Sequence, residues 1–186
     1  LSQPIERKAF VGIDGYVDKI IRVVQNRDTA QKPVHFSSIE AFAERVAAAA
    51  GRSAQIELSL QATKMGGNAP IMANALAQLQ VPTVCMGTLG FPEIHPVFEP
   101  LAAQCELLSL EQPAETNAFE FADGKLMFSN IEPFYRLSWS YLLEQIGLEK
   151  LRSSMAAAQV IALVDWSSLV NATQIWRGIL QDVLPA

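Results

Sequence analysis

Cysteine and histidine are scarce in this 186-residue sequence, which contains two of each. Cys85 and Cys105 lie in apolar runs and lack the spacing of metal ligands, and His35 and His95 lie far apart along the chain. We therefore expect neither a zinc site nor a disulfide scaffold.

The sequence also lacks an excess of positive charge and any long hydrophobic run. Its 14 basic and 19 acidic residues give a net charge of −5, which argues against nucleic acid or an anionic membrane as a partner. The longest apolar runs, residues 81–89 and 160–164, are far shorter than the roughly 20 residues that cross a bilayer. Residues 1–8 contain no signal-peptide core, and the absence of an initiator Met indicates that Leu1 is not the translated start. The compartment we expect is the cytoplasm.

What the sequence does contain is enough hydrophobic material, 50% of its residues, for one core of ordinary size. Strand-like and helix-like segments alternate, a pattern typical of a parallel sheet flanked by helices. No repeat or linker divides the chain, so we expect a single α/β domain over residues 1–186. The predicted strands are 8–13, 17–24, 56–60, 82–89, 106–110 and 159–164, and the predicted helices are 97–104, 139–146, 148–158 and 168–184.

Three local patterns refine this prediction. Ser37 to Glu40 forms a capping box at the start of a helix that ends near Gly51. The alternation of Ile56, Leu58 and Leu60 predicts a half-buried strand. In the last helix, the residues expected to face inward are Ile175, Ile179 and Val183.

A glycine turn, Gly66-Gly67-Asn68, joins a predicted strand to a predicted helix. We expect Asn68 to be the N-cap and Ile71, Ala75 and Leu79 to share one helix face. The glycines permit either a tight structural turn or a close approach of ligand to backbone, and both interpretations stay open. The turn is not a phosphate-binding Walker loop, because no Gly-Lys-Ser/Thr follows.

A β-hairpin is predicted where residues 116–121 and 125–129 flank Asp123-Gly124, a strong hairpin signal. Within it, Asn117 to Glu120 are expected to be strand residues and not metal ligands.

Three aspartates follow or open strands, where carboxylates can accept hydrogen bonds from sugar hydroxyls. Asp14 and Asp18 flank the first turn, and Asp165 follows the aliphatic strand 160–164. Each also has a structural interpretation, because Asp often bonds nearby amides in turns and Asp165 precedes a helix expected near Ser168.

Taken together, these segments resemble the ribokinase-like, or PfkB, family of carbohydrate and nucleoside kinases. Residues 11–20 are similar to the family's opening strand with its Gly and Asp-x-Ile pattern, and residues 66–79 to its Gly-Gly turn and alanine-rich helix. Residues 84–90 resemble its next strand. Thr116-Asn117-Ala118, followed by Asp123-Gly124, is similar to the Thr-Gly-x-Ala hairpin of its lid.

The resemblance implies an incomplete ribokinase-like fold, with a largely parallel sheet and small lid strands near 17–24 and 115–130. It implies that Asp18 binds sugar hydroxyls with Asp14 nearby, and that the lid excludes water from the phosphoryl group. The substrate-binding residues it indicates are Asp14, Asp18, Gly66, Gly67, Asn68, Thr116 and Asp165.

The family's catalytic Asp belongs to a Gly-Ala-Gly-Asp motif that is absent from these 186 residues. We therefore expect this chain to lack the catalytic residue and metal ligands and to be an excerpt of a longer protein. The resemblance implies the substrate-binding and lid portion of an ATP- and Mg²⁺-dependent kinase that phosphorylates a hydroxyl of a sugar or nucleoside. It also implies a homodimer formed through the lid strands.

Two alternatives remain. Ile71 and Phe91 stand where the family has Asn and an acidic residue, which favours a catalytically silent protein that binds a sugar or partner. The second alternative is an unrelated flavodoxin-like domain in which Gly66-Gly67 binds a phosphate.

Overall fold

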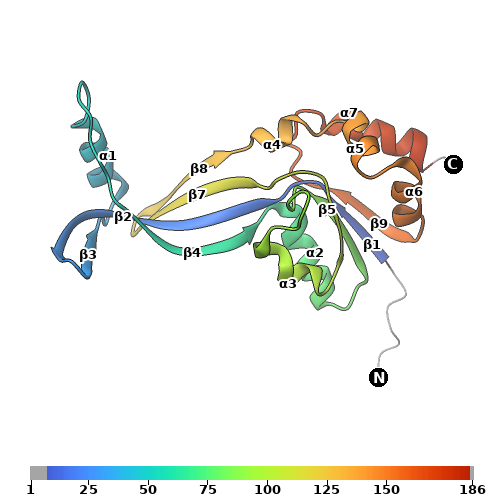
Figure 1. Cartoon of the computed structure of the whole chain (residues 1–186), viewed down its shortest axis with the longest axis horizontal. Coiled ribbons are helices and arrows are strands. Elements are labelled where there is room, and N and C mark those ends of the chain that lie inside the picture. Colours follow the sequence, from blue (N-terminus) through green and yellow to red (C-terminus); the bar gives the residue numbers. More distant parts are fainter. Residues whose placement is uncertain (1–7, 185–186) are drawn as a thin grey trace. The chain divides into compact units, whose positions relative to one another are not determined.

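A computed structural model describes residues 8–184 and divides the chain into two compact units (Figure 1). Of the described residues, unit 1 contains 8–17, 65–114 and 130–184, and unit 2 contains 18–64 and 115–129. Most of the segment that lacks a signal-peptide core, residues 1–7, lies outside the described residues.

Unit 1 is built on a four-stranded parallel sheet with the strand order β6-β5-β1-β9. After β6 the chain returns across the sheet, so β9 pairs with β1 on the side opposite β5. The expected parallel sheet is confirmed. Its strands are β1 (Lys8–Gly12), β5 (Thr83–Gly87), β6 (Glu106–Ser109) and β9 (Ala158–Leu163).

Helices cover both faces of this sheet, which is typical of parallel sheets. They are α2 (Asn68–Gln78), α3 (Glu99–Ala102, after a 3₁₀ turn Pro96–Phe98), α4 (Glu132–Tyr135), α5 (Trp139–Gln145), α6 (Leu148–Ala156) and α7 (Ala172–Gly178, continued by a π-helical turn Ile179–Val183).

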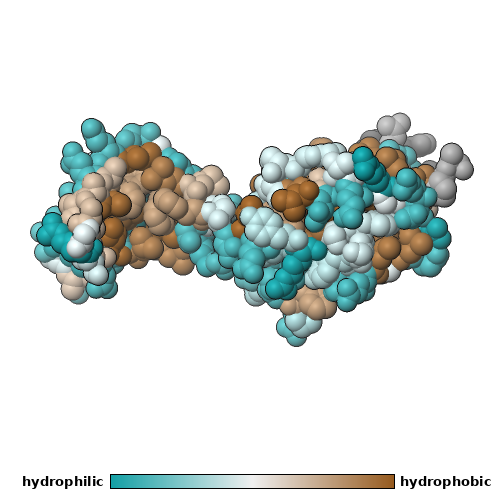
Figure 2. All heavy atoms as spheres, turned by 90° about the horizontal axis from the view of Figure 1, so that it is seen from above, coloured by the Kyte–Doolittle hydropathy of each residue, from teal (hydrophilic) through white to brown (hydrophobic). Residues whose placement is uncertain are grey.

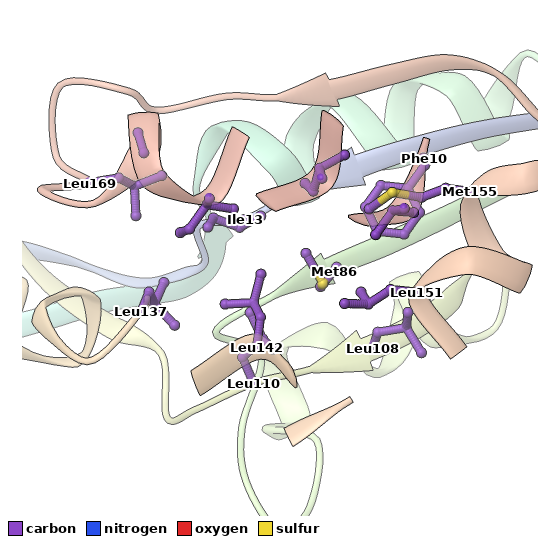
Figure 3. Close-up of a cluster of buried hydrophobic side chains, with 14 of the residues drawn as sticks. Phe10, Ile13, Met86, Leu108, Leu110, Leu137, Leu142, Leu151, Met155 and Leu169 are labelled. Carbon is purple, nitrogen blue, oxygen red and sulfur yellow. The ribbon is translucent and has the colours of Figure 1, made fainter. Parts of the chain in front are cut away.

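The alternation of side chains along β1 and β5 creates two hydrophobic clusters. Phe10 and Met86 point into the larger cluster, where Figure 3 shows Phe10 beside Met155 of α6. Val11 and Cys85 point to the other face, against Ala69 and Ala73 of α2 together with α3. Hydrophobic side chains fill both faces of the sheet. Polar chemistry is therefore expected at the sheet edges and strand ends.

Two helix predictions have different outcomes. The last helix begins at Ala172 and not near residue 168, but Ile175, Ile179 and Val183 are buried as expected. On α2 the predicted face is wrong, because Ile71 and Leu79 are 55% and 67% exposed. The small residues of α2 face the sheet instead, which lets the helix pack closely.

Unit 2 contains a sheet with the order β3-β2-β7-β8, and β4 pairs with β2. The predicted hairpin is confirmed as β7 and β8. Some of these strands begin or end in unit 1, and their bounds are β2 (Tyr16–Thr29), β3 (Lys32–His35), β4 (Leu58–Gly66), β7 (Ala114–Phe121) and β8 (Gly124–Asn130).

One helix, α1 (Ile39–Ala47), packs on the sheet of unit 2 through Phe42, whose ring stacks on Phe121 at 5.5 Å. The predicted capping box is wrong by one residue. Ser38 is the N-cap, and its hydroxyl accepts a hydrogen bond from the Ala41 amide at 3.2 Å. The Asp123 carboxylate accepts a further hydrogen bond from the Ile39 amide at 3.0 Å, so the hairpin turn completes the cap.

The predicted burial of Leu58 and Leu60 is also wrong, because their side chains are 49% and 59% exposed. Alternation indicates that one face of a strand is apolar, but not that another element covers it.

No helix in the described part of the chain has the length and hydrophobicity required to span a bilayer.

Candidate functional site

The site in unit 1 begins at the carboxyl end of β1, where Asp14 caps α2. The N-cap position of α2 is Gly67, which has no side chain to bond the free helix amides. Asp14, which is fully buried, accepts hydrogen bonds from the amides of Asn68 at 2.6 Å and Ala69 at 2.7 Å. The prediction that Asn68 is the N-cap is therefore wrong, since Asn68 is already helical and a residue from another element supplies the cap.

Gly67 is required by this arrangement. Its φ of 99° is rarely adopted by residues with a side chain, and a Cβ there would lie 3.0 Å from Oδ2 of Asp14. The group that approaches the backbone of the glycine turn is thus the Asp14 carboxylate of the same chain.

Burial raises the pKa of Asp14 to about 6, and the charge of Asp165 adds to the increase. The two helix amides oppose this shift by bonding the ionised form. Because a carboxylate occupies these amides, a phosphate at the same turn would meet both occupied donors and a like charge. This geometry contradicts the hypothesis that Gly66-Gly67 binds a phosphate.

Asp165 lies at the carboxyl end of β9, beside β1. The Val164 amide donates to the Gly12 carbonyl oxygen at 2.6 Å, which holds the two strand ends together. Asp165 has a φ of 62°, a left-handed conformation that is uncommon outside glycine. Since α7 begins only at Ala172, Asp165 does not cap that helix.

Both oxygens of the Asp165 carboxylate accept a hydroxyl hydrogen bond. The Ser168 hydroxyl donates to Oδ1 at 3.0 Å, and the Tyr16 hydroxyl donates to Oδ2 at 3.4 Å. Partial burial raises the pKa of Asp165, and the hydrogen bonds from Ser168 and Tyr16 act in the opposite direction. The polar cluster of unit 1 thus consists of Asp14, Tyr16, Asp165 and Ser168.

Sequence reasoning missed two members of this cluster, Tyr16 and Ser168. Burial raises the pKa of Tyr16 to about 12, so its phenol stays protonated and can donate at neutral pH. The sequence carries one usable signal, namely a tyrosine two residues after Asp14 at the same strand end. Nothing local distinguishes Ser168 from the exposed Ser167 before it.

The predicted site residues of unit 2 form a second polar cluster. The Thr116 side chain is buried, with its hydroxyl 3.0 Å from that of Ser129 across the hairpin. Burial raises the pKa of Asp18, while a hydrogen bond with Thr116 and the charge of Lys125 lower it. The structure therefore brings Asp18 and Thr116 together, and adds Lys125 and Ser129.

Apart from the Lys125 ammonium, these two clusters consist of carboxylates and hydroxyls, which suit the many hydroxyl groups of a polyol. Nowhere in residues 8–184 do three His, Cys, Asp or Glu side chains gather as metal ligands would.

The chain matches a known family along almost its whole length. The sequence profile of the family described as prokaryotic ketohexokinase matches residues 5–186. A ketohexokinase from Haloferax volcanii is 28% identical over 180 residues, which make up 96% of this chain and 48% of that protein. The chain thus spans about half the length of the curated relative it matches.

Solved structures share the fold at low sequence identity. A putative phosphofructokinase from Staphylococcus aureus matches with a TM-score of 0.53 and 13% identity, over 94% of this chain and 50% of that one. A carbohydrate kinase from Agrobacterium tumefaciens matches with a TM-score of 0.52 and 12% identity, over 85% of this chain and 53% of that one. These similarities confirm the predicted α/β fold.

Proposed function

Because the chain belongs to the prokaryotic ketohexokinase family, we propose that it is the substrate-binding and lid portion of a kinase that phosphorylates a hydroxyl of a ketohexose. Family membership confirms the ribokinase-like resemblance of the sequence and removes the flavodoxin-like alternative. The observation that carries the proposal is the Asp165 carboxylate, which two hydroxyls hold at the carboxyl end of β9.

The proposed roles follow from what each side chain offers. In unit 1, Asp165 would accept a hydrogen bond from a sugar hydroxyl. In unit 2, Asp18 would offer an acceptor of the same kind, supported by Thr116. The backbone of Gly66, Gly67 and Asn68 would line the site in unit 1. Asp14 holds the end of this turn by accepting hydrogen bonds from the amides of Asn68 and Ala69.

A ketohexose fits these groups better than a nucleoside does. A nucleoside base is bound largely by aromatic stacking, whereas the polar cluster of unit 1 contains two carboxylates and two hydroxyls. Tyr16 is the aromatic member, and its ring already packs edge-on against Phe134 at 5.0 Å. A sugar with several hydroxyls can satisfy such acceptors and donors together.

ATP and Mg²⁺ are the proposed phosphoryl donor and its metal, as expected of ribokinase-like kinases. The Gly-Ala-Gly-Asp motif that carries the family's catalytic Asp is absent from the 186-residue sequence, and the described residues contain no group of three metal-ligand side chains. The contribution of this chain is to bind and orient the acceptor, on which phosphoryl transfer strongly depends. Use of ATP is the reason that we propose the cytoplasm as its compartment.

We also propose that unit 2 forms a homodimer through its strands. Large hydrophobic side chains are exposed on two of them, Leu58 and Leu60 on β4 and Met127 and Phe128 on β8. Figure 2 shows hydrophobic residues gathered on the part of the molecule at its left, which is unit 2. Such side chains on strands are typical of an association surface. Light scattering of the wild type and of Leu60→Glu tests this, with a dimer and a monomer expected.

The test of the function is an activity panel with the whole protein, using MgATP and measuring ADP release. The acceptors are D-fructose and other ketohexoses, ribose, adenosine and fructose 6-phosphate. We expect turnover with a ketohexose. Turnover with adenosine alone would contradict the proposal, and sugar binding without ADP release would indicate the catalytically silent protein suggested by Ile71 and Phe91.

A further inference from the structure

Asp165 is held in an uncommon backbone conformation by contacts on both sides. The Ser168 amide donates to the Asp165 carbonyl oxygen at 3.1 Å, which closes a turn after β9. Leu169, the next residue, is buried in the larger cluster of unit 1 and anchors the turn there. The Ser168 hydroxyl therefore reaches Oδ1 of Asp165 from a fixed position.

The backbone and the ring of Tyr16 are anchored by contacts of their own, and its hydroxyl also bonds with Ser168. The Gly15 carbonyl oxygen before it accepts hydrogen bonds from the Thr88 hydroxyl and the Ala114 amide, both at 3.0 Å. The ring of Tyr16 packs against the fully buried Phe134. Both the backbone and the ring are thus held by the core of unit 1, so the phenol reaches Asp165 at little entropic cost.

The pKa of Asp165 is shifted by partial burial and by the hydroxyls of Ser168 and Tyr16. None of these influences is a cation. The titratable groups that face it are Asp14, from the turn after β1, and Tyr16 itself. Asp14 is an anion and cannot favour ionisation of a second carboxylate. The two hydroxyls are therefore the groups that favour the ionised form of Asp165.

We infer that Tyr16 and Ser168 are positioning residues that orient the Asp165 carboxylate for a ketohexose hydroxyl, an inference that rests on the proposed function. Each carboxylate oxygen uses one lone pair for its hydroxyl partner and keeps another for the sugar. Two fixed donors confine the carboxylate to one rotamer, so sugar binding does not have to order it. Neither residue contacts the reacting phosphoryl group in this scheme.

The test uses Tyr16→Phe and Ser168→Ala in the whole protein, since each removes one hydroxyl and little volume. At neutral pH we expect KM for the ketohexose to rise roughly tenfold in each variant with kcat near that of the wild type, as for a lost hydrogen bond to a charged group. Calorimetry with the sugar alone should show the same loss of affinity. Ser168→Thr keeps the hydroxyl and should restore much of the affinity.

The pH profile separates positioning from a general structural effect. Both hydroxyls lower the pKa of Asp165, so removing either one raises it. The acid limb of kcat/KM should therefore move to higher pH in both variants. Matched controls are Tyr135→Phe, whose ring is 57% exposed, and Ser167→Ala, also exposed, and neither should change KM or the profile.

The outcomes distinguish the inference from the function on which it rests. A wild type that neither phosphorylates nor binds ketohexoses contradicts both, whereas one that binds them without phosphorylation contradicts the proposed function alone and leaves the inference to calorimetry. An active wild type whose Tyr16→Phe and Ser168→Ala variants, with unchanged melting temperatures, keep its KM and pH profile overturns the inference alone. If Ser168→Ala does not fold, Ser168→Thr takes its place, because it keeps the hydroxyl. A KM for Ser168→Thr as high as that expected of Ser168→Ala would then overturn the role of this hydroxyl.

Discussion

Unit 1 and unit 2 bury their hydrophobic side chains to very different extents. Unit 1 has a cluster on each face of its parallel sheet, with side chains such as Phe10 and Leu142 fully buried. The cluster of unit 2 is built on Val23, Phe36 and Phe42 under a single helix.

This difference in hydrophobic burial affects what each unit can contribute to binding. The core of unit 1 fixes the turn after β9 and the ring of Tyr16, so its polar cluster is ordered by its own packing. Unit 2 leaves large side chains exposed on β4 and β8, which the proposed dimer contact would cover.

The strongest test of the unit 1 core is Phe10→Ala. Phe10 is fully buried, and its removal leaves a cavity that the close-packed helices cannot fill. We expect the free energy of unfolding to fall by about 4 kcal/mol. Urea unfolding measures this, with Val170→Ala, 68% exposed, as a control that changes it by less than about 0.5 kcal/mol. A loss below about 1 kcal/mol for Phe10→Ala would show that unit 1 is loosely packed.

The pH dependence of stability tests whether burial raises the pKa of Asp14, the buried cap of α2. Its folded pKa of about 6 lies above its usual value of 3.8, so its contribution to stability is full below about pH 4 and is lost as pH rises through 6. We expect the wild type to lose about 3 kcal/mol relative to Asp14→Asn between about pH 4 and pH 7. Urea unfolding of both proteins across this range gives the difference, and parallel curves would contradict the assigned environment.

Phe42→Ala is the matching test in unit 2. Phe42 joins α1 to the sheet, and its loss should destabilise this unit by about 2 kcal/mol. Because the contacts are confined to unit 2, amide hydrogen exchange should accelerate in α1 and β7 and stay unchanged in β1. Equal acceleration in β1 would show that the two units unfold as one.

The smallest effect is expected from an exposed ion pair of unit 2, Lys19 with Glu115 at 2.8 Å. Both side chains are substantially exposed, so Lys19→Met should change the free energy of unfolding by about 0.5 kcal/mol or less. Thermal unfolding in low and high salt checks this. A loss as large as that of Phe42→Ala would mean that unit 2 is held by charge and not by its aromatic cluster.

Those parts of the fold with strong local signals were predictable from the sequence. The hairpin at Asp123-Gly124 and the aliphatic strand β9 appear where the sequence places them, because turn chemistry and an unbroken apolar run are local properties. The inward positions Ile175, Ile179 and Val183 follow from helical spacing in the same way.

Features decided by distant residues were not predictable. The cap of α2 comes from Asp14, 54 residues before Asn68, and part of the cap of α1 comes from Asp123. Neither contact leaves a trace in the local pattern, which pointed to Asn68 and Ser37. The exposure of Leu60 likewise depends on whether another element covers β4.

The candidate site was predictable in part. Asp14 and Asp165 were placed at strand ends from the sequence, and parallel pairing of β1 with β9 brings them together. Tyr16 and Ser168 were missed because their importance lies in a contact to Asp165 across the fold.

The most direct test of the central claim is kcat/KM for ketohexose phosphorylation by the whole protein carrying Asp165→Asn or Asp18→Asn. The account predicts that each variant lowers kcat/KM by roughly 100-fold while the melting temperature changes little, since each removes a charged acceptor for the sugar. Values within about twofold of the wild type for both variants would contradict the assignment of these carboxylates to sugar binding.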